Sequence, residues 1–207
     1  MPDPEPDHIG PADWIHQLYP DATGWLTTFS ADRDGNRWTD WAPADDPATL
    51  ADAAAVRSAT CDVWFGVATR RERLGGGLRG SAGDCSAIPG LWVDIDIAGI
   101  GHHQGGRLAT DDAHAHRLVG AFPLPPTAVV HSGGGLQAWW LFGEMIDIDD
   151  TTRPLLASWG YTWATLADQH GIDVDNVFEV ARVMRLPGTV NRKEGGARPV
   201  VVLSADW

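Results

Sequence analysis

Asp94 and Asp96 are separated by a single residue within the apolar segment 91–97, LWVDIDI. In an extended strand, successive side chains point to opposite faces, so we expect both carboxyl groups to share one face with Trp92. Two neighbouring carboxylates beside apolar residues repel each other and lose hydration, and a divalent cation relieves both costs. Oxygen ligands of this kind suit Mg²⁺ or Mn²⁺. The pattern predicts a metal site, and a strand with a solvated polar edge is the alternative.

A run of glycines joins two apolar stretches in the segment 129–140, VVHSGGGLQAWW. The glycines at 133–135 let the backbone approach a ligand closely, and successive N–H groups can form a concave anion site. Ser132 and Gln137 flank the turn and can donate further hydrogen bonds. A triphosphate fits such a site, and a plain hairpin with a flexible turn is the alternative interpretation.

Acidic and basic residues follow each other in the segment 173–193, DVDNVFEVARVMRLPGTVNRK. We expect a helix over 177–184, stopped by the following Pro-Gly, in which Arg182 and Arg185 share one face. Guanidinium groups can bind phosphates through two parallel hydrogen bonds. The acids at the start of the segment would complete a metal site. The alternative is an amphipathic helix with a charged outer face.

In this order, the three segments resemble the archaeo-eukaryotic primase superfamily. The likeness is greatest to primase-polymerase domains of phages and plasmids, which are often joined to a helicase. It extends from about residue 62 to residue 200 and includes the stretch 78–84, LRGSAGD, which leads into the segment with the two aspartates. No single segment is specific to the family, but the combination of the three is.

The resemblance implies template-directed nucleotidyl transfer, in which Asp94 and Asp96 bind two Mg²⁺ or Mn²⁺ ions. The family usually supplies one more acidic ligand from the third motif. Asp175 is our choice for that ligand, with Asp173 and Glu179 as alternatives. The implied partners are nucleoside triphosphates and a single-stranded DNA template, and the implied process is primer synthesis or DNA polymerisation in phage or plasmid replication.

A second set of residues is implied to contact the nucleotide. Ser132 opens the second motif, and the family usually has a histidine near the phosphates where this chain has Gln137. His131 lies close in sequence, but strand alternation argues against a simple exchange of the two, so both remain candidates. The remaining implied phosphate contacts are Gly133, Gly134, Arg182, Arg185 and Lys193.

Two other classes of function use residues of the same types. A nuclease or a glycosyltransferase could use Asp94 and Asp96 as its metal-binding pair, and product analysis would separate these enzymes from a polymerase. A non-catalytic module could keep the fold and bind nucleotide or nucleic acid without turnover. The glutamine in place of the family's histidine makes this second alternative conceivable.

The composition is that of a globular domain with an acidic surface. The chain has 207 residues, of which 43% are hydrophobic and 21% charged, and its formal net charge is −13. An acidic chain is a poor general ligand for nucleic acid, so attraction must come from local basic clusters. The sequence offers two such clusters: Arg70, Arg71, Arg73 and Arg79, and then Arg182, Arg185, Arg192 and Arg198. Several of the 11 tryptophans lie in apolar runs, and we expect most of these to be core residues, among them Trp64, Trp92, Trp139 and Trp140.

The localisation we expect is the cytoplasm of a bacterial host. No apolar run approaches the roughly 20 residues that a membrane helix needs, and the two cysteines do not form a disulfide framework. There is no GxxxxGK[ST] motif, so we expect any helicase to belong to another chain or to a region beyond this sequence.

The mixture of helices and strands lacks strict alternation, which favours an α+β fold. With the resemblance, we expect an RRM-like antiparallel sheet that carries the acids and an additional N-terminal α/β unit. We expect residues 1–10 to be disordered and residues 11–207 to form one catalytic domain with a glycine- and histidine-rich loop at 98–109. The expected helices are 12–18, 46–59, 110–122, 151–169 and 177–184, with Asp46 and Thr110 as the caps of the second and third. The expected strands are 24–30, 63–68, 91–97, 128–131, 136–142 and 200–203.

Overall fold

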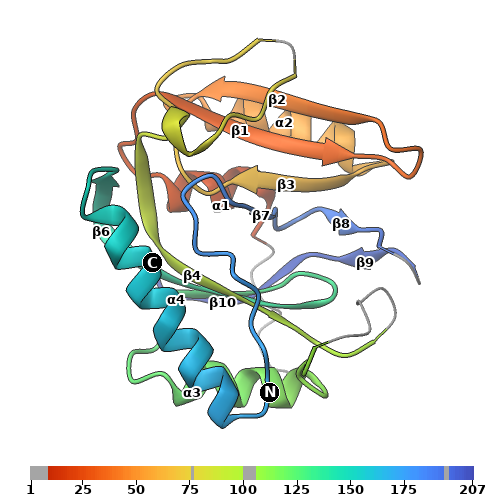
Figure 1. The fold of residues 1–207 in the computed structure, drawn as a ribbon. Helices are drawn as coiled ribbons and strands as arrows, with labels where there is room; N and C mark the ends of the chain where they lie inside the picture. The colour runs from red at the N-terminus through yellow and green to blue at the C-terminus, as the bar shows by residue number, and fades with distance from the viewer. Residues whose placement is uncertain (1–8, 76, 100–105, 194–195) are drawn as a thin grey trace, which may run out of the picture.

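The structure is a computed structural model that describes residues 9–75, 77–99, 106–193 and 196–207. The disorder expected for residues 1–10 therefore falls almost entirely outside the described residues, as does the central half, 100–105, of the loop expected at 98–109. The described chain forms two four-stranded sheets, each with two helices on one side (Figure 1).

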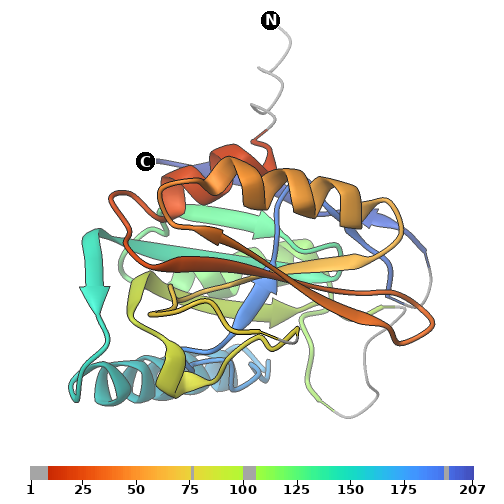
Figure 2. The same ribbon diagram turned by 90° about the horizontal axis from the view of Figure 1, so that it is seen from above.

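The first sheet contains most of the N-terminal third of the chain. All its neighbouring strands are antiparallel, and their order is β2 (Arg37–Pro43), β1 (Trp25–Ala31), β3 (Asp62–Gly66) and β7 (Val183–Arg185). Two helices, α1 (Pro11–Leu18) and α2 (Pro47–Ser58), lie together on one side of it (Figure 2). The side chain of Asp46 caps α2 by accepting a hydrogen bond from the backbone N–H of Thr49, as the sequence predicted.

The second sheet carries the two aspartates. Its antiparallel order is β10 (Val201–Ala205), β5 (Ala128–His131), β6 (Gly135–Asp147) and β4 (Ala87–Asp96). Two helices, α3 (Asp112–Ala121) and α4 (Thr152–Gln169), pack on the face that β4 and β6 turn away from the first sheet (Figure 1). Short pieces complete the fold: the 3₁₀ turn η1 (Ala82–Asp84) and the strands β8 (Val190–Asn191) and β9 (Arg198–Pro199).

Each face of the second sheet packs on its own tryptophan-rich core. Trp92 and Trp139 point toward the first sheet, where the ring of Trp139 stacks on Phe65 with centroids 5.7 Å apart. Trp140 lies on the other face, where its ring packs against that of Trp163 of α4 with centroids 5.3 Å apart. The expectation that most tryptophans are core residues is confirmed for Trp92, Trp139 and Trp140, whereas Trp64 is partly exposed.

The α+β class, the antiparallel sheet with the acids and the separate N-terminal α/β unit are confirmed. Strand β5 matches its predicted bounds, and helix α4 differs by one residue. The predicted helix over 177–184 is wrong: residues 177–182 are irregular and the next three form β7. Strand pairing overrides the local helix propensity of this segment, because β7 forms the edge of the first sheet beside β3. Helix α3 is capped by Asp111 rather than Thr110, and β2 was not predicted.

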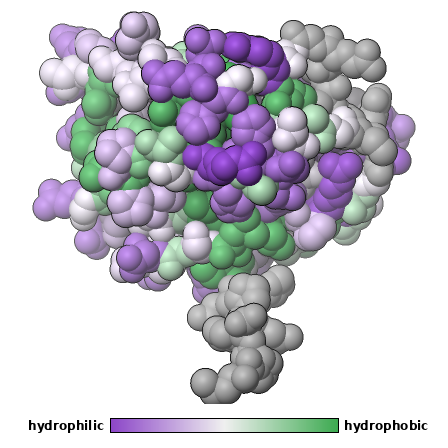
Figure 3. Space-filling view, turned by 90° about the horizontal axis from the view of Figure 1, so that it is seen from below, coloured by the Kyte–Doolittle hydropathy of each residue, from purple (hydrophilic) through white to green (hydrophobic). Residues whose placement is uncertain are grey.

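No helix in the described part of the chain is long and apolar enough to cross a membrane. On the surface seen from below Figure 1, polar residues predominate and apolar residues form separate patches (Figure 3).

Candidate active site

A cavity of about 130 Å³ lies where β3 and β7 of the first sheet meet β4 and β6 of the second. It brings together all three segments that the sequence singled out. The predicted residues that line it are Asp94, Asp96, Ser132, Gly134, Gln137, Asp175, Arg182, Arg185 and Lys193, and its other lining residues are Trp64, Val183 and Asn191.

The two aspartates lie on the same face of β4, as alternation predicted. Val93 and Ile95 point the other way, into the core under α3 and α4. Asp96 pairs in register with Gly135 of β6. A Cβ atom added at Gly135 would lie 2.2 Å from the carbonyl oxygen of Ile95, so glycine is required for this close approach of the strands.

Asp94 has the most perturbed carboxyl group at this site. Burial raises its pKa to about 7, and the neighbouring charges of Asp96 and Asp175 act in the same direction. Arg182 and Lys193 oppose the shift. A carboxyl group that is poorly solvated and surrounded by other acids is stabilised in its charged form by a cation.

The described residues contain no group of three His, Cys, Asp or Glu side chains arranged to hold a metal ion. The site instead offers the Asp94–Asp96 pair, with Asp175 on the cavity wall. That donor set fits Mg²⁺ or Mn²⁺, because Mg²⁺ is usually bound by one or two carboxylates, water and substrate phosphates rather than by a full protein cage.

The structure brings only one of the three candidates for the third acid to the cavity. Asp175 lines it, whereas Asp173 pairs with Arg107, whose Nη2 lies 2.7 Å from Asp173 Oδ1. Glu179 lines a different and larger cavity. The assignment of Asp175 as a metal ligand stays a prediction.

Arg185 reaches the cavity, but its guanidinium is already engaged. Nη1 lies 2.6 Å from Asp62 Oδ1, and Nη2 donates to Asn191 Oδ1 at 3.0 Å. Its Cζ also sits 4.1 Å from the centroid of the Trp64 ring. Burial lowers the pKa of Arg185, and the charge of Asp62 opposes that effect. Arg185 therefore organises the cavity wall, which leaves Arg182 and Lys193 as the cations better placed for phosphates.

Gln137 and His131, the rival candidates for the nucleotide contact, point to opposite faces of the sheet. Gln137 is in register with Asp94, whereas His131 pairs with Leu136, which belongs to the core under α3. Gln137 is 2% exposed and lines the cavity, and its Oε1 has no hydrogen-bond partner among the described residues. His131 Nε2 instead lies 3.2 Å from Asp112 Oδ1 of α3.

The glycine turn does not present its N–H groups as a row of free donors. The N–H of Gly133 donates to Nδ1 of His131 at 3.1 Å, and the N–H of Ser132 donates to the carbonyl oxygen of Gly135. Gly133 has a φ of 81°, and an added Cβ would lie 2.8 Å from Cβ of Asn191. The N–H groups of Ser132 and Gly133 are thus already engaged, and Gly133 serves close packing. Gly134 lines the cavity, and the assignment of Gly133 and Gly134 as phosphate contacts stays a prediction.

Two residues that hold the site together were not predicted. Asn191 accepts from Nη2 of Arg185 and donates to the carbonyl oxygen of Ser132 at 2.8 Å, so it ties the third segment to the glycine turn. Asp62 accepts from Arg185 and from the N–H of Arg192, at 2.6 Å in each case. Asn191 lies within the third motif, which was its only sequence signal.

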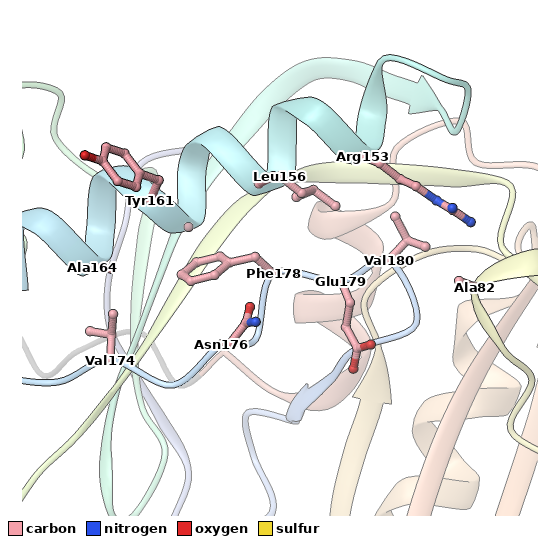
Figure 4. A pocket seen from close by; sticks show the side chains of 12 residues that line it. Ala82, Arg153, Leu156, Tyr161, Ala164, Val174, Asn176, Phe178, Glu179 and Val180 are labelled. Carbon is pink, nitrogen blue, oxygen red and sulfur yellow. The ribbon is translucent and has the colours of Figure 1, made fainter. Parts of the chain in front are cut away.

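The larger cavity, of about 600 Å³, lies between α4 and the segment 174–180 (Figure 4). Phe178 points toward α4, and an added Cβ at Gly160 would lie 2.6 Å from its ring. The lining of this larger cavity includes Arg153 and Glu179 but neither Asp94 nor Asp96. Size alone is therefore a poor guide to the chemistry of this chain.

No family model matches the chain, and no curated protein matches it. Two solved structures are similar, each with a TM-score of 0.53 and 14% identity over 94% of this chain. One is primase RepB', of which the match covers 56%, and the other is the catalytic domain of primase RepB' in complex with initiator DNA, of which it covers 83%. The chain thus spans little more than half the length of the longer structure, and its fold is similar to that of the RepB' primase catalytic domain.

Proposed function

We propose that this chain is a primase-type nucleotidyltransferase that joins nucleotides on a single-stranded DNA template. The observation that carries the proposal is the pair Asp94 and Asp96, side by side in a cavity that also contains Arg182 and Lys193. The similarity to the fold of a primase catalytic domain supports the same reaction.

Asp94 and Asp96, with Asp175, would hold Mg²⁺ or Mn²⁺. When bound, two such ions activate a 3′-hydroxyl group and neutralise charge on the α-phosphate and the leaving pyrophosphate. The protein then needs to supply position and further positive charge rather than a covalent intermediate.

The other cavity residues suit the polar parts of a nucleotide. Arg182 has a buried Nε with no hydrogen-bond partner in the described chain, and Lys193 is exposed at the rim, so both can meet phosphate oxygens. Gln137 can donate its amide N–H to a phosphate, but it cannot carry a proton or a charge through the reaction. Charge compensation would therefore fall to the two cations and the metal ions.

The direct test is synthesis on single-stranded DNA without a primer, with Mg²⁺ or Mn²⁺ and labelled nucleotides. We expect products longer than a dinucleotide from the wild-type chain and none from Asp94→Asn. Release of nucleotides from the template would indicate a nuclease, and transfer of a sugar would indicate a glycosyltransferase. The same assay with dNTPs and with NTPs identifies the preferred substrate.

Gln137 favours a second candidate, a binding module without turnover. If the neutral amide cannot support catalysis, the chain should bind nucleotide in a metal-dependent manner and form no product. In either case we propose a role in phage or plasmid replication in a bacterial cytoplasm, beside a helicase domain or subunit.

A further inference from the structure

One row of side chains crosses the whole first sheet and ends in the catalytic cavity. The strand register places Thr39 of β2 opposite Phe29 of β1, Phe29 opposite Trp64 of β3, and Trp64 opposite Arg185 of β7. Directly paired residues of neighbouring strands point to the same face. Trp64 and Arg185 line the cavity that contains Asp94, so the row leads from the cavity to the far edge of the sheet.

Two neighbouring aromatic rings lie along this row with a guanidinium group at each end. Arg185 lies over the ring of Trp64 at 4.1 Å, and the rings of Trp64 and Phe29 have centroids 5.7 Å apart. Cζ of Arg79 lies 5.6 Å from the centroid of Phe29. Phe29, Trp64 and Arg79 are all partly exposed, on the face opposite to the buried Leu26 that packs in the core. We call Phe29, Trp64 and Arg79 the stacking row.

The loop that supplies Arg79 is fastened over this face of the sheet. The hydroxyl group of Thr39, which lies opposite Phe29 on the edge strand β2, donates to the carbonyl oxygen of Gly77 at 2.9 Å. Arg79 therefore places a positive charge beside the aromatic rings in a chain whose net charge is −13, and the same loop exposes Arg71 and Arg73 along with Glu72. Positive charge next to exposed aromatic faces is the chemistry that binds single-stranded nucleic acid.

We propose that the stacking row is the track on which unpaired bases of the single-stranded template lie as they approach the catalytic cavity. The inference rests on the proposed function, which requires that the template strand move along the row toward the cavity. Phe29 and Trp64 offer rings on which any base can stack, and Arg79 offers a planar cation for a base or its phosphate. Every base has a π face, so the track holds the template without reading its sequence. Duplex DNA, whose bases are already stacked and paired, would not use it.

Binding of a fluorescent oligo-dT to the full chain, measured by anisotropy without nucleotide or metal, tests the row. We expect Phe29→Leu to weaken binding roughly tenfold with an unchanged salt slope, because it removes stacking alone. Arg79→Gln should weaken binding and also reduce the slope of log affinity against log salt by about 0.7, the value for one phosphate contact on a single strand. Phe29→Trp should retain wild-type affinity.

Two substitutions elsewhere match these changes in chemistry. Arg117→Gln on α3 removes an exposed positive charge, and Tyr161→Leu on α4 removes a ring that is 76% exposed. Both should bind oligo-dT as the wild type does. Equal weakening by Arg79→Gln and Arg117→Gln would mean that only overall charge matters, and the row would be rejected. Circular dichroism and thermal unfolding exclude loss of the fold as the cause.

Photocrosslinking reports direct contact between DNA and the aromatic rings, which these residues would not make if their role were only structural. An oligonucleotide with 5-iodouracil should crosslink to Phe29 or Trp64, and mass spectrometry of the peptides identifies the position. Crosslinks confined to other elements would overturn the proposal. Crosslinks and tight binding in a chain that makes no product would support the row and reject the proposed activity. Synthesis by a Phe29→Leu variant with unchanged DNA affinity would support the proposed activity and reject the row.

Discussion

Asp94 faces Gln137 directly across the antiparallel pair of β4 and β6, and both side chains line the smaller cavity. The carboxyl group has a pKa raised by burial, and the amide oxygen has no hydrogen-bond partner among the described residues. Two poorly satisfied oxygen atoms on facing strands make an environment that a cation stabilises. The strand register therefore explains why the cavity suits metal-dependent chemistry even though it is small.

Replacement of Asp94 or Asp96 by asparagine should abolish synthesis and leave the fold intact. We expect the rate of nucleotide incorporation to fall by a factor of about 10³, because charge stabilisation at the reacting phosphate is lost. Asp94→Asn should be as stable as the wild type or slightly more stable, since it removes a buried charge. Incorporation assays together with thermal unfolding check both parts. The control is Asp150→Asn, at an exposed position before α4. Wild-type incorporation by a folded double variant would contradict the site assignment.

The stability of the metal-free protein should fall as pH rises from about 4 to about 7. The pKa of Asp94 is about 7 in the folded chain against the ordinary aspartate value of 3.8, so in that window the folded state holds a proton that the unfolded state has released. A shift of three units corresponds to about 4 kcal/mol for a fully buried group, and the partial exposure of Asp94 makes the real effect smaller. Urea unfolding at several pH values should show this loss, and Asp94→Asn should flatten the profile.

Metal binding should show the opposite trend with pH, because the ligand must be ionised. We expect the apparent affinity for Mn²⁺ to rise toward pH 7 and to level off above it. Calorimetric titrations at about pH 6 and pH 8 measure this. Affinity that is equal at the two pH values would indicate that Asp94 is not a ligand.

Asp62→Ala should destabilise the chain by about 3 kcal/mol, because it leaves the buried guanidinium of Arg185 without its carboxylate. It also removes the acceptor for the N–H of Arg192. Urea unfolding measures the loss. A matched control is Asp40→Ala, which breaks a more exposed pair with Arg57 and should cost less than about 1 kcal/mol. If both variants lose the same stability, Asp62 has no special role in holding the cavity wall.

The residues that could be predicted are those whose position follows from local periodicity. Strand alternation alone places Asp94 and Asp96 on one face, and the Pro- and Gly-bounded apolar runs locate β4, β5 and β6. The three motifs also converge in one cavity, as the resemblance implied. Local pattern was enough because each of these segments is a buried strand whose two faces meet different environments.

The residues that could not be predicted depend on contacts between distant segments. Arg182 and Arg185 have helical spacing, but the indole of Trp92 donates to the carbonyl oxygen of Val177 and β3 pairs with β7, so the segment is irregular and then extended. Asp62 is 123 residues from the arginine that it holds. No local signal marks such a pair, because its partners meet only after both sheets have formed.

The last prediction concerns Gln137, to which the sequence resemblance assigns the place of the family's usual histidine. Gln137→Ala should raise the nucleotide concentration needed for half-maximal synthesis roughly tenfold, since a hydrogen bond to a charged group contributes about 1.5 kcal/mol. Turnover at saturating nucleotide should change little, because the metal ions and cations remain. Steady-state kinetics with a fixed template measure the two effects separately.

His131→Ala is the informative comparison, because His131 is six residues away on the opposite face of the sheet and contacts Asp112. Its loss removes the acceptor for the N–H of Gly133, so it should lower stability modestly and leave the nucleotide requirement unchanged. Gln137→His should be tolerated and should add a dependence on pH near the imidazole pKa of about 6.5. If His131→Ala raises the nucleotide requirement and Gln137→Ala does not, the phosphates are bound on the α3 side of the sheet. The cavity beside Asp94 would then not be the nucleotide site.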